Sequence, residues 1–274
     1  MSERYSRNEG LFGADGQRRI RETKVAIVGL GGLGSHVGQQ LAYLGVRDYG
    51  LVDFDIVTDS SLNRLVGAQD ADVERQTKKV AVTEGMIKSI TPDAAVAPLD
   101  ARITDARTED VIAGADVVFG CLDRDLARLQ LTDLCARYGR TLFDLASDVT
   151  NENGEVHYGG RVVLCDGNRC LVCLAMLDQQ EMARDSMSPD QREAHDRIYG
   201  VRRRALGDTG PMVVSINGAV ASIAVTEFMA LVTGLRMPFT NLRYYADRQL
   251  IRQSADQAAP DCYYCNGIWA TANS

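Results

Sequence analysis

The stretch 24–34, KVAIVGLGGLG, decides the fold of this chain. It opens with the aliphatic run 25–28, which predicts a short strand buried on both faces. A turn with four glycines follows, and we expect these to bind a nucleotide: Gly29, Gly31, Gly32 and Gly34. A helical pattern covers residues 37–44, and Gly45 is placed to end that helix. Such a strand, turn and helix bring backbone N–H groups close to a phosphate at the helix N-terminus.

Outward from this stretch, aliphatic runs and helical patterns alternate along the chain. We expect strands at 50–53, 95–97, 117–119 and 141–145. We expect helices at 72–90, ended by Pro92, and at 124–138. Strands that alternate with helices predict an α/β fold with a Rossmann-like, doubly wound and mostly parallel sheet.

The alternation stops after residue 145, and antiparallel signals replace it. Asn153-Gly154 between two strand-like runs indicates a hairpin. Residues 178–209 are polar, with no clear apolar period, so we expect a long surface loop that is partly helical. A second hairpin is expected at 242–251. These segments predict an antiparallel C-terminal extension of the sheet.

Composition argues against several classes of protein. The chain has 45% hydrophobic and 24% charged residues, as a soluble globular enzyme does. Its net charge of −7 makes broad nucleic-acid binding unlikely, because that binding depends on Lys and Arg. The apolar run 212–231 contains Ser215, Asn217 and Glu227, which are costly in lipid, so we expect a buried helix and no membrane span. The N-terminus is polar, without a signal peptide, and we expect a cytoplasmic protein.

Asp53 stands at the end of the second expected strand. A carboxylate at this place accepts hydrogen bonds from ribose hydroxyls. The pattern fits an NAD-dependent dehydrogenase as well as an enzyme that uses ATP. A glycine-rich turn without any ligand is a third interpretation. Residues outside the glycine motif have to decide among these.

Polar residues that follow the other strands carry more information about chemistry. The segment 60–64, SSLNR, follows the second strand, Lys79 lies on the next expected helix, and Asp123 ends the fourth strand. In these residues the chain resembles the bacterial adenylyltransferases that activate sulfur-carrier proteins for molybdopterin and thiamine synthesis. Those enzymes are relatives of the ubiquitin-activating enzymes. The resemblance begins at 4–7, RYSR, and 13–17, GADGQ, and extends to paired cysteines near the C-terminus.

The resemblance implies an ATP site made of several of these residues. The residues that would bind ATP are the four glycines together with Asp53, Asp55, Ser61, Arg64, Lys79 and Asp123. Arg64 and Lys79 would neutralise the triphosphate, and Asp123 would hold Mg²⁺. Relatives carry Asn at the position of Ser61, whose hydroxyl has a shorter reach than an amide. The alternative is that Arg64 and Lys79 are solvated charges and Asp123 is a helix N-cap.

The resemblance also implies a role for Arg7 and hence an oligomeric state. Arg7 matches an arginine that relatives insert into the ATP site of the neighbouring subunit, in the manner of an arginine finger. A finger that acts in trans requires a second copy of the chain. We therefore expect a homodimer.

Two Cys-x-x-Cys pairs stand out among the seven cysteines. The first pair is Cys170 and Cys173, and the second is Cys262 and Cys265. Four thiolates in two such pairs suit a tetrahedral, structural Zn²⁺ site. The long interval between the pairs matches the adenylyltransferases. A redox-active pair is the alternative.

The reaction implied by the resemblance joins AMP from ATP to the C-terminal glycine carboxylate of a ubiquitin-like protein. It would serve protein conjugation or sulfur transfer, with a conjugating enzyme or a sulfur donor as a further partner. The alternatives are adenylation of a carboxylate on a small molecule, peptide or modified tRNA, and a non-catalytic nucleotide-sensing scaffold. One adenylation domain would cover 1–274. Its parts would be an arm at 1–23, a nucleotide-binding half at 24–150, and a partner-binding half at 151–274 with the zinc site and the loop 174–209.

The loop 174–209 contains no cysteine, although many relatives transfer the acyl group to a cysteine there. Either the adenylate passes directly to a partner's nucleophile, or a hydroxyl accepts the acyl group as an oxyester. Ser186 and Ser188 lie near the place of the cysteine in relatives. A hydroxyl becomes a good nucleophile only when a base activates it. His195 is the candidate base. A pair of solvated loop serines is the other interpretation.

Overall fold

The computed structural model describes residues 3–152, 155–188, 190–191, 212–255 and 258–272. Its centre is a sheet of eight strands in the order β3-β2-β1-β4-β5-β6-β7-β8. The strands are β1 (Lys24–Val28), β2 (Asp48–Val52), β3 (Ala95–Leu99), β4 (Val117–Gly120), β5 (Thr141–Glu152), β6 (Glu155–Cys165), β7 (Asn241–Tyr245) and β8 (Leu250–Gln253). Strands β1 to β5 pair in parallel, and β5 to β8 pair antiparallel. The predicted doubly wound sheet with an antiparallel extension is confirmed.

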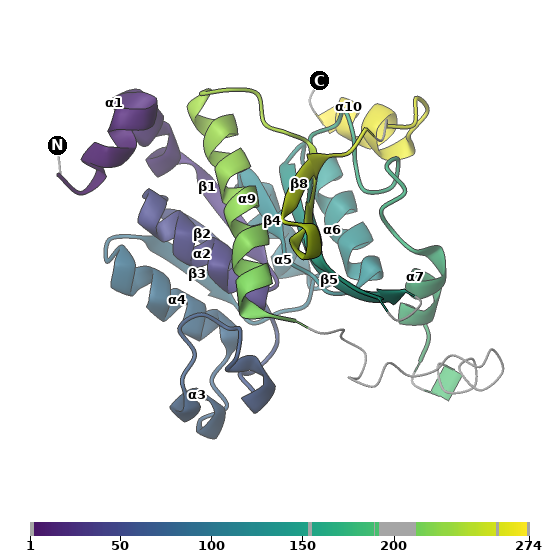
Figure 1. The fold of residues 1–274 in the computed structure, drawn as a ribbon, viewed down its shortest axis with the longest axis horizontal. Helices are drawn as coiled ribbons and strands as arrows, with labels where there is room; N and C mark the ends of the chain where they lie inside the picture. The colour runs from purple at the N-terminus through teal and green to yellow at the C-terminus, as the bar shows by residue number, and fades with distance from the viewer. Residues whose placement is uncertain (1–2, 153–154, 189, 192–211, 256–257, 273–274) are drawn as a thin grey trace.

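Helices cover both faces of this sheet (Figure 1). The helices on one face are α1 (Ser6–Glu22), α2 (Gly32–Leu44), α4 (Lys79–Ile90) and α9 (Val214–Thr233). Those on the other face are α5 (Ala106–Gly114), α6 (Asp125–Arg137) and the π-helix Tyr263–Trp269. Shorter helices are α3 (Asp70–Glu74), α7 (Gln179–Asp185) and α10 (Ala270–Ala272), with 3-10 turns at Glu3–Tyr5, Asp59–Ser61 and Ala246–Arg248. Because both faces are covered, residues 25–28 of β1 are all buried, as expected for a central parallel strand.

The apolar run near residue 220 forms a core helix, α9. By length and composition α9 would be able to cross a membrane, but 56% of its apolar window is buried inside the protein. Val220, Ala224 and Phe228 are fully buried in the cluster that α9 shares with α2 and the sheet. The predicted buried helix is confirmed.

The helix predicted over 72–90 is wrong in its first half. Helix α3 ends at Glu74, Gln76 has a positive φ of 52°, and α4 begins only at Lys79. The intervening segment instead pairs with the chain after β2, through a bridge between Ile56 and Lys78. This pairing with distant residues outweighs the helical pattern.

The first predicted hairpin is confirmed, with longer strands than predicted. β5 and β6 pair from Leu142 and Cys165 to Glu152 and Glu155. The turn residues Asn153 and Gly154 lie outside the described residues. The second hairpin, β7 and β8, is confirmed as well.

Candidate functional site

The carboxyl ends of the parallel strands lie at the lower edge of the sheet in Figure 1, where α9 begins. In open α/β sheets, ligands bind outside this edge. The loops after β1, β2 and β4 contain most of the residues that we expect to bind ATP. The geometry of each of these residues is described below, starting with the glycine motif.

At three positions of the motif a side chain would clash with neighbouring atoms, so glycine is required there. The fourth position borders open space. Gly29 has a φ of 88°, and a Cβ added there would lie 2.6 Å from a backbone carbonyl oxygen in the loop after β4. A Cβ on Gly34 would overlap the carbonyl of Gly29, and a Cβ on Gly32 would overlap the side-chain amide of Asn217. A Cβ on Gly31 would meet no atom within 4 Å. The tight turn therefore leaves space at the start of α2.

The start of α2 is suited to an anion. Gly31 is the N-cap residue, and among the described residues no side chain caps the helix. The first N–H groups of an α-helix have no partner within the helix, and the helix dipole adds partial positive charge. These N–H groups, beside the open space at Gly31, fit a phosphate group of ATP.

Asp53 connects the end of β2 to the glycine motif. Its carboxylate accepts hydrogen bonds from the backbone N–H groups of Leu30 (2.6 Å) and Asp55 (2.8 Å). Burial raises the pKa of Asp53, and the positive charge of Lys79 partly offsets this. Each carboxylate oxygen has capacity for a further hydrogen bond. The side chain therefore shapes the glycine turn and can still accept from a ribose.

Lys79, the first residue of α4, forms an ion pair with Asp55. Nζ of Lys79 lies 2.7 Å from Oδ2 of Asp55, and the lysine side chain is only 14% exposed. The backbone N–H of Lys79 also donates to the carbonyl of Asp55 at 3.1 Å. The pairing that ends the predicted long helix thus brings these two residues together. A triphosphate would compete with the carboxylate for the ammonium group or share it, because the group has three donors.

The segment after β2 brings Arg64 close to the glycine motif. Within the same segment, the hydroxyl of Ser61 contacts a neighbouring residue. Cδ of Arg64 lies 3.4 Å from the place that a Cβ on Gly32 would take. The guanidinium donates to the carbonyl of Ser60. Ser61 is buried, and its Oγ lies 3.0 Å from Oγ1 of Thr58 in a capping box. Arg64 therefore adjoins the expected phosphate site, and the Ser61 hydroxyl stabilises its own loop.

Asp123 is exposed in the loop between β4 and α6. The N-cap residue of α6 is Arg124, so the alternative interpretation of Asp123 as a helix cap is wrong. The same loop contacts Gly29 through the backbone carbonyl of Cys121. Mg²⁺ is commonly held by one or two carboxylates together with substrate phosphates and water. An exposed carboxylate beside a phosphate site fits that pattern.

Sequence reasoning missed the buried ion pair that supports this loop. Arg128 on α6 and Asp144 on β5 are 5% and 1% exposed, and their side chains are in contact. Arg128 also donates to the backbone carbonyl of Leu122, next to Asp123. The sequence did contain a sign of this ion pair. An aspartate within an otherwise apolar strand needs a buried partner.

Arg7 lies on α1, at the opposite end of α2 from the glycine motif. Gln17 on α1 donates its side-chain amide to the carbonyl of Leu44, the last residue of α2, at 2.9 Å. Tyr5 lies against Gly45, just beyond that helix. A helix the length of α2 spans about 20 Å. The N-terminal arm of one chain is therefore separated from its own glycine motif by the length of α2.

The four paired cysteines come together on the sheet face that α5 and α6 cover. Their sulfur atoms all lie within 4.8 Å of one another. The sulfur of Cys170 is 3.6 Å from that of Cys262 and 3.8 Å from that of Cys173, and the sulfurs of Cys173 and Cys265 are 3.9 Å apart. Four Zn–S bonds of ~2.3 Å in a tetrahedron give sulfur separations of about 3.8 Å. The donor set and its spacing fit Zn²⁺.

Ser186 and Ser188 lie just after α7, close to the loop that contains Asp123. Asp185, the last residue of α7, forms an ion pair with Arg124 at 3.3 Å. Arg124 directly follows Asp123 in the chain. The two serines are therefore in the neighbourhood of the expected Mg²⁺ ligand.

The hydroxyls of these serines have local partners. Ser186 donates to the carbonyl of Ala183 at 2.6 Å, and Ser188 accepts from the backbone N–H of Gln191 at 3.3 Å. Within the described residues, neither hydroxyl contacts a carboxylate or an imidazole. His195, the base named from the sequence, lies outside the described residues.

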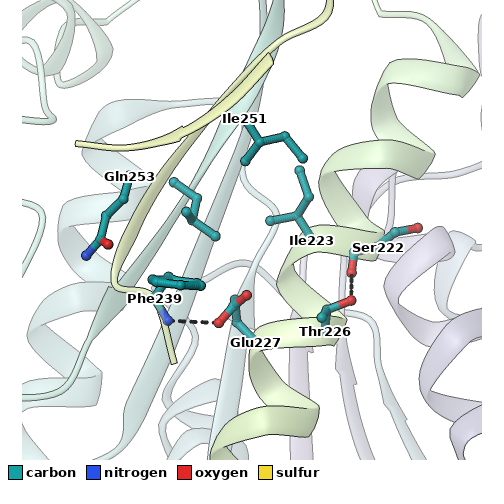
Figure 2. A pocket seen from close by; sticks show the side chains of 8 residues that line it. Ser222, Ile223, Thr226, Glu227, Phe239, Ile251 and Gln253 are labelled. Carbon is teal, nitrogen blue, oxygen red and sulfur yellow. Dashed lines mark hydrogen bonds between the residues drawn. The ribbon is translucent and has the colours of Figure 1, made fainter. Parts of the chain in front are cut away.

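A cavity of about 450 Å³ lies away from all of these residues, between α9 and the β7–β8 hairpin (Figure 2). Ile223, Phe239 and Ile251 line it with apolar surface, and the backbone N–H of Phe239 donates to the carboxylate of Glu227 at 2.8 Å. None of its lining residues belongs to the predicted site. Its volume alone would suggest a ligand site, but the groups suited to a nucleotide are at the strand ends. We therefore place the candidate site there.

Comparison with curated proteins identifies relatives over the whole chain. The ThiF family matches residues 5–265. The sulfur carrier protein ThiS adenylyltransferase and the molybdopterin-synthase adenylyltransferase of Escherichia coli are each 28% identical over 270 residues, which is 96% of this chain and 95% of each relative. The SAMP-activating enzyme E1 of Haloferax volcanii is 37% identical over 135 residues, 48% of this chain and 49% of that protein. The relatives that align over the whole chain confirm the expected enzyme class, an adenylyltransferase.

Solved structures confirm the fold independently. The crystal structure of Escherichia coli MccB with AMPCPP and MccA has a TM-score of 0.73 at 18% identity, over 97% of this chain and 74% of that chain. A likeness at this identity supports the fold alone, and the family match rests on the sequence. The chain belongs to the ThiF family, within the E1-like adenylyltransferase superfamily.

Proposed function

We propose that this adenylyltransferase uses ATP and Mg²⁺ to adenylate the C-terminal glycine carboxylate of a ubiquitin-like protein. The main support is the group of residues at one edge of the sheet. There the start of α2 borders open space at Gly31, Arg64 lies beside Gly32, and Lys79 and the exposed Asp123 belong to segments that follow β2 and β4. The names of the whole-length relatives, which refer to a sulfur carrier protein and to molybdopterin synthase, support an acceptor of this class.

Each side chain has a defined task in the proposed reaction. The N–H groups of α2 and the guanidinium of Arg64 bind the phosphates, and Asp53 accepts from the ribose. Asp123 would hold Mg²⁺, which would neutralise phosphate charge. The glycine carboxylate attacks the α-phosphorus, and the bond from that phosphorus to pyrophosphate breaks. Positive groups stabilise the charge that develops on the leaving pyrophosphate.

The proposal has further parts that concern the whole chain. Residues 1–274 form one adenylation domain with a structural Zn²⁺, and two copies form a homodimer. The enzyme works in the cytoplasm, without a membrane or nucleic acid. The product serves a conjugating enzyme or a sulfur donor.

Exchange of labelled pyrophosphate into ATP tests the proposed reaction. The purified chain is incubated with Mg²⁺, ATP and a candidate ubiquitin-like protein that ends in glycine. Exchange should depend on that protein and should fall strongly when its terminal glycine is deleted, since the new C-terminal carboxylate then stands one residue short of the α-phosphorus. Absence of exchange with every such candidate would contradict the proposed acceptor.

The alternative acceptor is a carboxylate on a small molecule, a peptide or a modified tRNA. The solved structures of MccB with AMPCPP or ATP, and with MccA, share the fold over almost the whole of this chain and are compatible with it. Exchange that requires one of these acceptors in place of a ubiquitin-like protein would favour the alternative.

Replacement of Arg7 by alanine should lower exchange by about a hundredfold or more, because an arginine finger contributes at least that much in phosphoryl transfer. The fold should be retained, since Arg7 is exposed on α1. Arg18→Ala is a matched control. Arg18 is also exposed on α1, where it forms local ion pairs with Asp15 and Glu22, and its loss should leave exchange unchanged.

Mixing two inactive variants tests whether Arg7 acts in trans. In a heterodimer of Arg7→Ala and Asp123→Ala chains, one site combines an intact Asp123 with the partner's Arg7. Exchange should therefore return on mixing. No return of activity, or a strictly monomeric active enzyme in sedimentation, would contradict this placement.

We expect the adenylate to pass directly to a partner's nucleophile, without a covalent enzyme intermediate. The reason is that the hydroxyls of Ser186 and Ser188 contact no base within the described residues, and an unactivated hydroxyl is a poor nucleophile. Incubation with ATP and the acceptor, followed by denaturing gels with and without thiol reductant, should show no adduct while adenylate still forms.

The opposite result would establish the oxyester. Its signature is an adduct that survives thiol reductant and is cleaved by hydroxide. Loss of the adduct in Ser186→Ala or in Ser188→Ala would then identify the acceptor residue.

A further inference from the structure

Asn217 is a fully buried amide without a partner. It lies in the first turns of α9, and its side chain is 0% exposed. Within the described residues, neither Nδ2 nor Oδ1 has a hydrogen-bond partner. Buried amides are nearly always paired, because an unpaired one costs stability. An exception of this kind calls for a partner from outside the chain, either a ligand group or a water molecule.

The amide faces the glycine motif. Nδ2 of Asn217 is the atom that a Cβ on Gly32 would overlap, and Cδ of Arg64 lies 3.4 Å from the same place. The absence of a side chain on Gly32 therefore lets the amide pack directly against the start of α2. Arg64, which we expect to bind phosphate, lies beside the same place.

Two helix N-termini meet at this point. Asn217 adjoins Gly32 at the start of α2, and its neighbour Gly218 packs against the ring of His36 one turn further on. Helices α2 and α9 thus run side by side in the same direction, and both begin at the lower edge of the sheet in Figure 1. Their dipoles add partial positive charge at one place. The surroundings of Asn217 favour an anion.

We propose that Nδ2 of Asn217 donates a hydrogen bond to a phosphate oxygen of the nucleotide bound at α2. This rests on the proposed use of ATP. The Ser61 hydroxyl, on the segment that carries Arg64, is engaged with Thr58. The amide of Asn217 offers a donor from α9, beside Gly32.

The test uses AMPCPP with Mg²⁺ as the probe and the full chain as the protein. Asn217→Leu has nearly the same shape but no donor. Its affinity for AMPCPP should fall about ten- to a hundredfold, as expected for the loss of a hydrogen bond to a charged group. Its affinity for adenosine, which has no phosphate, should not change. The melting temperature of the protein without ligand should stay the same or rise, because the substitution removes an unpaired buried amide.

Thr233→Val is the matched control on the same helix. Its hydroxyl is also buried, but it donates to the carbonyl of Met229 at 2.7 Å, at the opposite end of α9. This variant should melt at a slightly lower temperature and bind AMPCPP like the wild type.

Each possible outcome of these measurements either supports or overturns the proposed role of Asn217. If the wild type binds AMPCPP and Asn217→Leu binds it equally well, the inference is overturned and the proposed function stands. Equal losses for adenosine and AMPCPP, with a lower melting temperature, would show a structural role and overturn it too. A wild type that does not bind AMPCPP overturns both. If Asn217→Leu does not fold, Asn217→Ala gives the same comparison.

Discussion

Replacement of Asp123 by alanine is expected to abolish pyrophosphate exchange, with a fall of about a thousandfold or more. The reason is that Asp123 is an exposed carboxylate in the loop after β4 and would be the Mg²⁺ ligand of the proposed ATP site. A bound metal ion contributes several kcal/mol to stabilising charge in a transition state. The variant should fold normally, since the side chain is exposed and does not cap α6. Exchange assays with saturating Mg²⁺ and ATP measure the effect.

Two further variants are needed to interpret the effect of Asp123→Ala. Asp116→Ala removes an exposed carboxylate at the other end of β4, where it accepts from the backbone N–H of Lys24, and should leave exchange unchanged. Lys79→Ala removes one phosphate contact, worth roughly 2.7–4 kcal/mol for a charge contact in the transition state. Near-normal exchange in both Asp123→Ala and Lys79→Ala would refute the assignment of the ATP site.

Conversion of the four paired cysteines to serine is expected to remove one zinc per chain and to destabilise the protein strongly. The sulfurs join the segment after β6 to the π-helix, and Cys170, Cys262 and Cys265 are buried in the cluster with Trp269. A structural zinc site contributes directly to folding free energy. We expect the melting temperature to fall by about 10 °C or more, which for a chain of this size is about 5–6 kcal/mol.

The zinc prediction is checked by elemental analysis and thermal unfolding of the same samples. Cys135→Ser is the matched control, because Cys135 is equally buried in the same cluster but lies outside the four-sulfur group. It should keep the zinc. Wild-type protein purified without zinc, or a quadruple variant with unchanged stability and metal content, would contradict the site.

The sequence predicted those elements that depend on local patterns. The strand at 24–28, its glycine turn and α2 follow from an aliphatic run, from residues that allow close approach, and from helical spacing. The error at 72–90 arose because Ile56 pairs with Lys78, and a pairing between distant residues leaves no trace in local periodicity. The π-helix Tyr263–Trp269 was also missed, since its aromatic residues have no helical spacing.

The residues of the candidate site were named from the sequence, but the contacts between them were not predicted. Spacing and resemblance selected Lys79 and Asp55 separately, and only the folded chain shows them as an ion pair. Asn217 had one visible signal, a polar residue inside an apolar run. That signal argued only against a membrane span, because nothing in the sequence shows which buried amides find partners.

The ion pair of Lys79 and Asp55 also affects competition among anions. An unpaired ammonium group beside a helix N-terminus would attract the inorganic phosphate and sulfate dissolved around the protein. The Asp55 carboxylate is a tethered competitor, held at high effective concentration by the fold. A small anion has only one contact with which to displace it, whereas ATP also offers a ribose and a chain of phosphates. If ATP binds as proposed, this ion pair favours the whole nucleotide over its fragments.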